Sequence, residues 1–165
     1  MEIFWWYFFY VYLCSKFKKM GKNYLISKLI EIREKLNLST SEFERFGINR
    51  QTLHNFEEGV NSSVDTLFAY IKVLYGFAGF VLLVKETGKD GKTKITGLVE
   101  KDKLGVLLSA IRHKDGLSMQ KMYMKTGIRD TKVSAVEFGR GYRMSTLEKY
   151  VNALDTKVEF DIVMV

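Results

Sequence analysis

Apolar residues between positions 22 and 75 recur at the spacing of an α-helix and predict four consecutive helices. Charged and polar residues fill the positions between them, so each helix is expected to bury one stripe and expose the rest. The helices are expected from Lys22 to near Asn37, between Ser39 and Gly47, from Arg50 to about Glu57, and from about Val64 to Leu74.

Local signals set the ends of the short helices. The hydroxyls of residues 39–41 and the acid Glu42 suit the start of the second helix. Gly47 suits its end, because glycine adopts the left-handed conformation that reverses the chain. Asn49 is expected to cap the third helix. Phe43 and Phe46 are expected to form the buried face of the second helix.

The pattern changes period after the fourth helix. Phe80 to Val84 and Ile95 to Val99 are short apolar runs that flank an Asp90-Gly91 turn, which predicts a β-hairpin. The final residues, Val158 to Val165, predict another strand.

The chain repeats itself with an offset of eighty residues. The segment GINRQTLHNFEEG at 47–59 returns as GIRDTKVSAVEFG at 127–139. The match continues through the fourth helix, so the repeated unit is a whole set of helices. The second set is expected to begin near Lys103, to continue from Leu117-Ser118 to Gly127 and from Asp130 to Val136, and to end with Ser145 to Leu154. The first unit has one residue fewer than the second before its turn glycine, so either its second helix or the turn before that helix should be shorter.

The first residues form an apolar and aromatic leader. The run from Ile3 to Cys14 is followed by Lys16, Lys18 and Lys19. It is too short for a membrane-spanning helix, which needs about 20 residues, and its charges follow the run rather than precede it, unlike a signal peptide. Either Met20 is the physiological start and the leader is translated upstream sequence or a segment packed on the body, or the leader is an interfacial anchor. The missing polar face favours the first interpretation.

Composition narrows the function classes. The 165 residues carry a net charge of +7, which suits an anionic partner without identifying one. The single cysteine, Cys14, excludes an internal disulfide and fits the cytoplasm. His54 and His113 have no second ligand at metal spacing, and no paired acids or phosphate loop are present. An enzyme is therefore the least expected class, and no cofactor or metal is predicted.

Two segments of the chain carry a resemblance to a known family: residues 43–57 and residues 122–137. Gly47 and Gly127 lie in the turn of each segment, and a Glu-x-Gly follows at the end of each third helix. Each unit resembles the helix-turn-helix domain of the phage Cro and repressor (XRE-like) family, including its antitoxin relatives. The resemblance implies a mainly α fold with two tandem four- to five-helix domains, each followed by a β-strand, the strands pairing into a small sheet. The expected boundaries are a leader at 1–21, domains at 22–79 and 103–157, a hairpin linker at 80–102, and a strand at 158–165.

The resemblance also assigns roles to exposed residues. The third helix of each unit would enter the DNA major groove, where side chains distinguish base pairs. Glu57 and Glu137 are expected to be structural, either capping their helix or tying it to a neighbour. Met119, near the place where the family often carries a phosphate-binding glutamine, is a poor substitute. The base-facing residues would be Asn49, Arg50, Gln51, Asn55, Arg129, Asp130, Thr131, Ser134 and Ala135; the phosphate contacts would be Thr40, His54, Lys132, Arg140 and Arg143.

The expected protein is a cytoplasmic, sequence-specific DNA-binding transcription regulator with double-stranded DNA as its partner. It would act as a single-chain pseudo-dimer on an imperfect palindrome, with the strands as a route to self-association. The alternative is an antitoxin-like or other protein-interaction module, with a toxin or another protein as partner, in which the second unit no longer reads DNA. A membrane partner is not expected.

Overall fold

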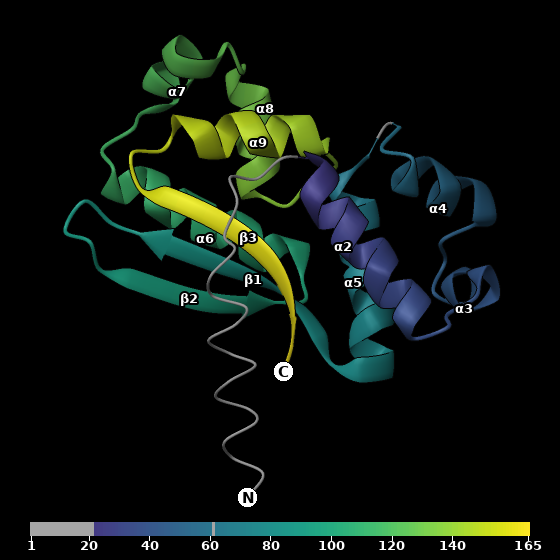
Figure 1. Cartoon of the computed structure of the whole chain (residues 1–165). Coiled ribbons are helices and arrows are strands. Elements are labelled where there is room, and N and C mark those ends of the chain that lie inside the picture. The colour runs from purple at the N-terminus through teal and green to yellow at the C-terminus, as the bar shows by residue number, and fades with distance from the viewer. Residues whose placement is uncertain (1–21, 61) are drawn as a thin grey trace, which may run out of the picture.

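The computed structural model describes residues 22–60 and 62–165, which form eight helices and three strands (Figure 1). The chain is mainly helical with a small antiparallel sheet, as expected; the predictions for the leader concern residues outside the described part. The elements are α2 (Lys22–Lys35), α3 (Thr40–Arg45), α4 (Arg50–Glu57), α5 (Val64–Ala78), β1 (Phe80–Thr87), β2 (Thr93–Leu98), α6 (Lys101–Lys114), α7 (Met119–Thr126), α8 (Asp130–Glu137), α9 (Met144–Ala153) and β3 (Lys157–Met164).

Helices α2–α5 are here called unit one and helices α6–α9 unit two. The two units repeat the same set of polar contacts. In unit one, Tyr70 donates to Glu57 at 2.9 Å and Arg33 donates to the same carboxylate at 3.2 Å. In unit two, Tyr150 donates to Glu137 at 2.6 Å, and Arg112 donates to the same carboxylate at 2.5 Å. Both arginines also donate to a backbone carbonyl in the turn before the second helix, at Leu38 and at Leu117.

The prediction that Glu57 and Glu137 tie their helices to neighbours is therefore confirmed. Each carboxylate joins the third helix of its unit to the first and the fourth.

The trimmed second helix of unit one is confirmed, and it corrects one expectation. α3 has 6 residues and α7 has 8. Gly127 closes α7 with φ 69° and donates to Tyr123, whereas α3 already ends at Phe46, which lies at the C-cap with φ −97°. Phe46 is consequently turned off the inner face and is 50% exposed, so its prediction as a buried residue was wrong. Phe43 alone anchors α3, at 0% exposure.

The sheet joins the two units. Its order is β2-β1-β3, with both neighbours antiparallel to β1. The hairpin and the pairing of β1 with β3 are as predicted. Leu82, Val84, Phe160 and Ile162 lie on the face that joins the core shared by both units.

The pairing register reveals an internal twofold relationship. Leu82 lies opposite Ile162, and Ser63 forms an isolated antiparallel bridge with Arg143. Both pairs match a residue with its equivalent in the eighty-residue repeat. Around the bridge, Val64 donates to Tyr142 and Met144 donates to Ser62, which is the same hydrogen bond made in both directions. Contacts of this kind are typical of an isologous interface between two copies.

Candidate nucleic-acid interface

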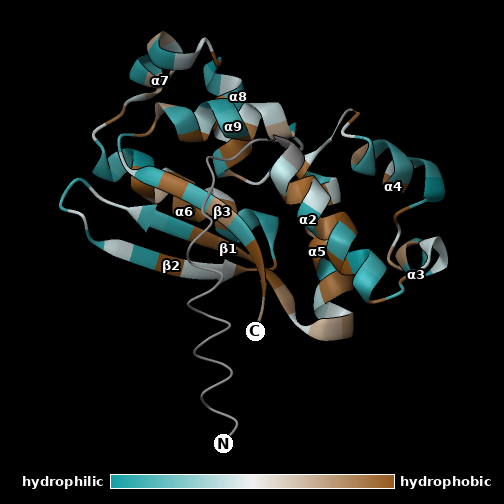
Figure 2. Cartoon of the chain, viewed as in Figure 1, coloured by the Kyte–Doolittle hydropathy of each residue, from teal (hydrophilic) through white to brown (hydrophobic). Residues whose placement is uncertain are grey.

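Helix α4 presents the predicted reading surface of unit one. Leu53 and Phe56 are 1% and 2% exposed and fix the inner side of the helix. Arg50, Gln51 and His54 are exposed on the outer side. Figure 2 shows α4 as a largely hydrophilic helix at the rim of the molecule.

Three polar side chains of this surface already have partners. The Asn49 carboxamide oxygen accepts from the Thr52 backbone N–H at 2.8 Å, which confirms the N-cap. This oxygen is committed to the helix, so only the amide hydrogens of Asn49 remain for a ligand. One turn along, Gln51 donates to the Asn55 carboxamide at 2.8 Å, and this contact orients both amides on one face.

A hollow of about 350 Å³ lies between the start of α3 and helix α4. Thr40, predicted to bind phosphate, lies at this hollow together with Arg50, Gln51 and His54. The structure therefore brings four of the residues predicted from unit one to a single surface depression. Leu53 and Glu57 form the rest of its lining.

Helix α8 presents a different surface. Its inner side is held by Val133 and Val136, both 0% exposed. The remaining predicted residues lie on or near the outer side, but the set is chemically poorer than that of α4. Arg129, Asp130, Thr131 and Lys132 are exposed, and Ser134 and Ala135 are half-buried.

The α8 surface has two further differences from α4. Arg129 stands at the N-cap without a side-chain cap bond, where Asn49 caps α4. Asp130 lies in the first turn of α8, where an acid is favourable to the helix dipole. Met119 packs partly against the core, as befits a side chain without a phosphate-binding group.

Two of the three predicted phosphate contacts of unit two, Arg140 and Arg143, lie beyond the end of α8, and Lys132 lies on the helix itself. Arg140 stands over the ring of Phe138 with 5.6 Å between its guanidinium and the ring centroid. Phe138 is 69% exposed, and sequence reasoning missed it because a lone aromatic in a turn has no periodic signal. Arg143 is exposed at the N-cap of α9 and bridges Ser63, so it lies beside the internal twofold axis.

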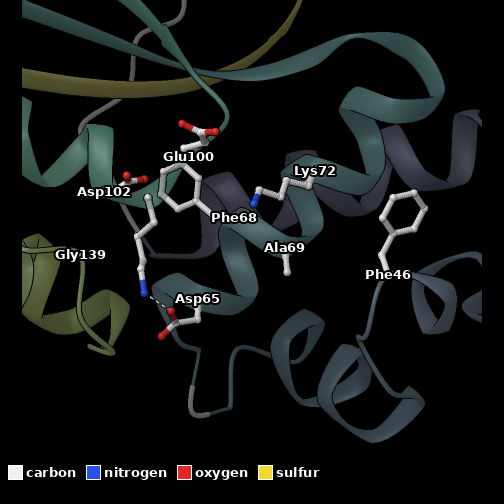
Figure 3. Close-up of a pocket in the computed structure, with 9 residues that line it drawn as sticks. Phe46, Asp65, Phe68, Ala69, Lys72, Glu100, Asp102 and Gly139 are labelled. Atoms are coloured by element: carbon white, nitrogen blue, oxygen red, sulfur yellow. Dashed lines mark hydrogen bonds and ion pairs between the residues drawn. The ribbon is translucent and has the colours of Figure 1, made fainter.

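A second, unpredicted hollow lies between the units. This cleft of about 590 Å³ is lined by α5, by the start of α6 and by the turn at Gly139 (Figure 3). Lys101 forms an ion pair with Asp65 across it. Lys72, Glu100 and Asp102 add charges of both signs, and Phe46 and Phe68 add rings. Its mixed lining matches no residue set that the sequence singled out.

Metal sites and membrane spans were searched over residues 22–60 and 62–165. No group of three or more His, Cys, Asp or Glu side chains in these residues could hold a metal ion. None of the helices formed by the described residues is long and apolar enough to cross a membrane.

Comparisons with protein-family models, with curated proteins and with solved structures give no match.

Proposed function

We propose that this chain is a cytoplasmic, sequence-specific DNA-binding transcription regulator of the helix-turn-helix class. In this proposal the two units act as the halves of a single-chain pseudo-dimer. Helices α4 and α8 enter successive major grooves and read the two half-sites of an imperfect palindrome.

The internal twofold relationship is the observation that carries the proposal. Leu82 pairs with Ile162, and Ser63 pairs with Arg143, each with its own equivalent in the repeat. Proteins with a helix-turn-helix commonly bind DNA as twofold dimers whose symmetry matches that of the operator. A chain that contains its own twofold relationship needs no second subunit to meet that requirement.

The two reading surfaces support an asymmetric site. Arg50 can pair with guanine, and Gln51 or Asn55 with adenine. At the equivalent of Arg50, unit two carries Asp130, which repels phosphate but accepts from cytosine. Unit one is therefore assigned most of the sequence preference.

A mobility-shift assay on DNA flanking the gene tests the proposal. Arg50→Ala and Gln51→Ala should each weaken specific binding by about 1–3 kcal/mol, roughly 5- to 150-fold, and relax the preference at one base position. Arg45→Ala is the matched control, because Arg45 is an exposed cation at the end of α3 outside the hollow beside α4. It should change affinity much less.

Three outcomes would contradict this proposal. A perfectly symmetric operator would contradict the unequal half-sites. A two-subunit mass, with each chain using only unit one, would contradict the pseudo-dimer. Absence of binding by the wild-type protein at low salt would contradict DNA recognition altogether.

The alternative function is a protein-interaction module, and one observation favours it. Tyr123 and Met124 on α7 are 50% and 78% exposed, and exposed aromatic and methionine side chains are common at protein interfaces. If unit two binds a protein, Met124→Ser should abolish co-purification of the product of a neighbouring gene and leave DNA affinity unchanged.

A further inference from the structure

One face of the sheet is contacted at β3 by the start of α2, which reaches Asp161. Strand alternation divides the sheet into the core face, with Leu82 and Ile162, and an outer face. Figure 1 shows α6 behind the strands. On the outer face, Val81 lies opposite Val163, and Lys85 lies opposite Ile95.

The outer face is apolar in its middle and acidic toward β3. Leu83 and Val163 are half-buried, and Ile95 is 43% exposed. Glu159 and Asp161 of β3 lie on this same face, opposite Lys85 and Leu83. Both carboxylates are buried, at 5% and 4% exposure, and already have lysine partners: Lys85 and Lys157 for Glu159, and Lys28 for Asp161. The face therefore offers apolar contacts at Leu83, Ile95 and Val163.

The start of α2 lies at this acidic side. Tyr24 donates to Asp161 at 3.5 Å, and Lys28 forms an ion pair with the same carboxylate. The chain that precedes α2 therefore reaches the body of the protein at β3, on the outer face.

The preceding residues, 1–21, lie outside the described part of the chain. Their apolar composition predicts that another surface covers them. The run from Ile3 to Cys14 holds two tryptophans and six other aromatic residues. Each aromatic side chain can bury about 150–250 Å², and soluble proteins rarely leave a connected apolar surface of more than a few hundred Å² in water.

We propose that this leader docks on the outer face of the sheet, with its apolar run over Leu83, Ile95 and Val163. Along the chain, Lys16, Lys18 and Lys19 separate this run from α2. The distance is no obstacle. Three strands span about 10 Å, and a twelve-residue run reaches about 40 Å when extended.

The internal twofold relationship adds an independent argument. The segment immediately before α6 is β2, which covers one edge of the sheet. The leader holds the equivalent place in the chain, immediately before α2, so we expect it to lie against the sheet as well. This docking is independent of the DNA-binding proposal, because it concerns neither α4 nor α8.

Tryptophan fluorescence of the full chain tests the docking. Trp5 and Trp6 are the only tryptophans in the chain, so the emission reports the leader alone. Docking predicts a blue-shifted emission that acrylamide quenches poorly. Leu83→Lys and Ile95→Lys should each shift the emission to longer wavelength and increase the quenching. Val106→Lys is the matched control, since Val106 is 68% exposed on α6, and it should leave both unchanged.

The test does not depend on the less conservative variant. If circular dichroism shows that Leu83→Lys is unfolded, Ile95→Lys is sufficient to test the docking. Ile95 is 43% exposed on an edge strand, so a lysine there should not prevent folding. Emission like that of tryptophan in water in the wild-type chain would overturn the docking. So would emission that shifts to the blue only with phosphatidylserine vesicles, which indicates a lipid anchor. A blue shift that requires a dimeric mass would also overturn it, in favour of a second copy.

Discussion

Glu137 shows how far a single side chain supports a unit. It is 8% exposed and accepts from Arg112, Tyr150 and Ser109. Arg112 is itself 4% exposed, so loss of the carboxylate would leave a buried cation without its partner. The equivalent pair in unit one is more accessible: the side chains of Arg33 and Glu57 are 21% and 16% exposed.

Glu137→Ala should therefore lower the free energy of unfolding by about 3–5 kcal/mol, the usual cost of breaking a buried ion pair by removing one partner. Glu57→Ala is the matched variant, and it should cost less because water reaches Arg33. Urea denaturation of both variants measures the difference. Equal losses would show that burial of the pair is not what sets its contribution.

The same carboxylate predicts a pH dependence. Burial alone would raise the pKa of Glu137, but hydrogen bonds from Arg112 and Tyr150 outweigh it and hold the pKa below the ordinary value of 4.5. A lowered folded-state pKa contributes stability above that ordinary value, and the contribution is lost as the pH falls through the folded-state pKa. Urea midpoints of the wild type should therefore fall below pH 4.5 more steeply than those of Glu137→Gln.

A second carboxylate sharpens that experiment. Hydrogen bonds from Lys125 and Lys89 lower the pKa of Asp155 to about 2. Asp155 is on the surface, so its contribution is reduced by solvent, and Asp155→Asn should change the acid slope less than Glu137→Gln does. The reverse order would contradict the assignment of the acid sensitivity to the buried pair.

At the scale of elements, the contact between α6 and α8 depends on a glycine. A Cβ atom at Gly105 would lie 2.4 Å from the backbone oxygen of Glu137, which cannot move without displacing α8. A Cβ atom at Gly76, in α5, would meet only the ring of Phe46 at 3.8 Å, an ordinary contact. The two helical glycines therefore differ in tertiary environment rather than in local conformation.

Gly105→Ala should destabilise the protein, and Gly76→Ala should stabilise it by about 0.5–1 kcal/mol, the usual preference of a helix for alanine. Thermal denaturation of the two variants measures opposite shifts of the melting temperature. A stabilised Gly105→Ala protein would mean that α6 and α8 are not packed as closely as described.

The start of α4 separates two roles of Asn49. Asn49→Ala removes the cap and should cost about 1 kcal/mol of stability, whereas Asn49→Ser keeps a capping oxygen and should preserve it. If Asn49 also contacts a base through its amide hydrogens, Asn49→Ser should still weaken specific DNA binding. Thermal denaturation and mobility shifts on the same two proteins distinguish these contributions.

At the scale of the whole molecule, the twofold relationship allows the predicted reading residues of α4 to be transferred to the equivalent positions of α8. The residues equivalent to Asn49, Arg50, Gln51 and Asn55 are Arg129, Asp130, Thr131 and Ala135. They are exposed apart from the half-buried Asn55 and Ala135, so replacement should leave the core intact.

A chain with Arg129→Asn, Asp130→Arg, Thr131→Gln and Ala135→Asn should select a more symmetric palindrome from random DNA than the wild type does. Its oligomeric state in solution should be the same as that of the wild type. Selection of an unchanged site would show that α8 does not read bases.

The sequence by itself determined the elements and the repeat, because helical spacing, caps and turn residues act over a few neighbours along the chain. Asn49 as a cap, Gly127 as a helix end and the hairpin were all predictable for that reason. The unequal chemistry of the third helices was also predictable, because the sequence itself gives the residue types on their exposed sides.

Only the tertiary structure decided how those surfaces are arranged. Phe46 was predicted to be buried, and its exposure depends on where α3 ends relative to α5. The engagement of Gln51 with Asn55 and the hollow beside Thr40 are also products of packing. Above all, the matching of Leu82 with Ile162 and of Ser63 with Arg143 requires both units to be folded and docked, because pairing across eighty residues is set by the fit of two surfaces.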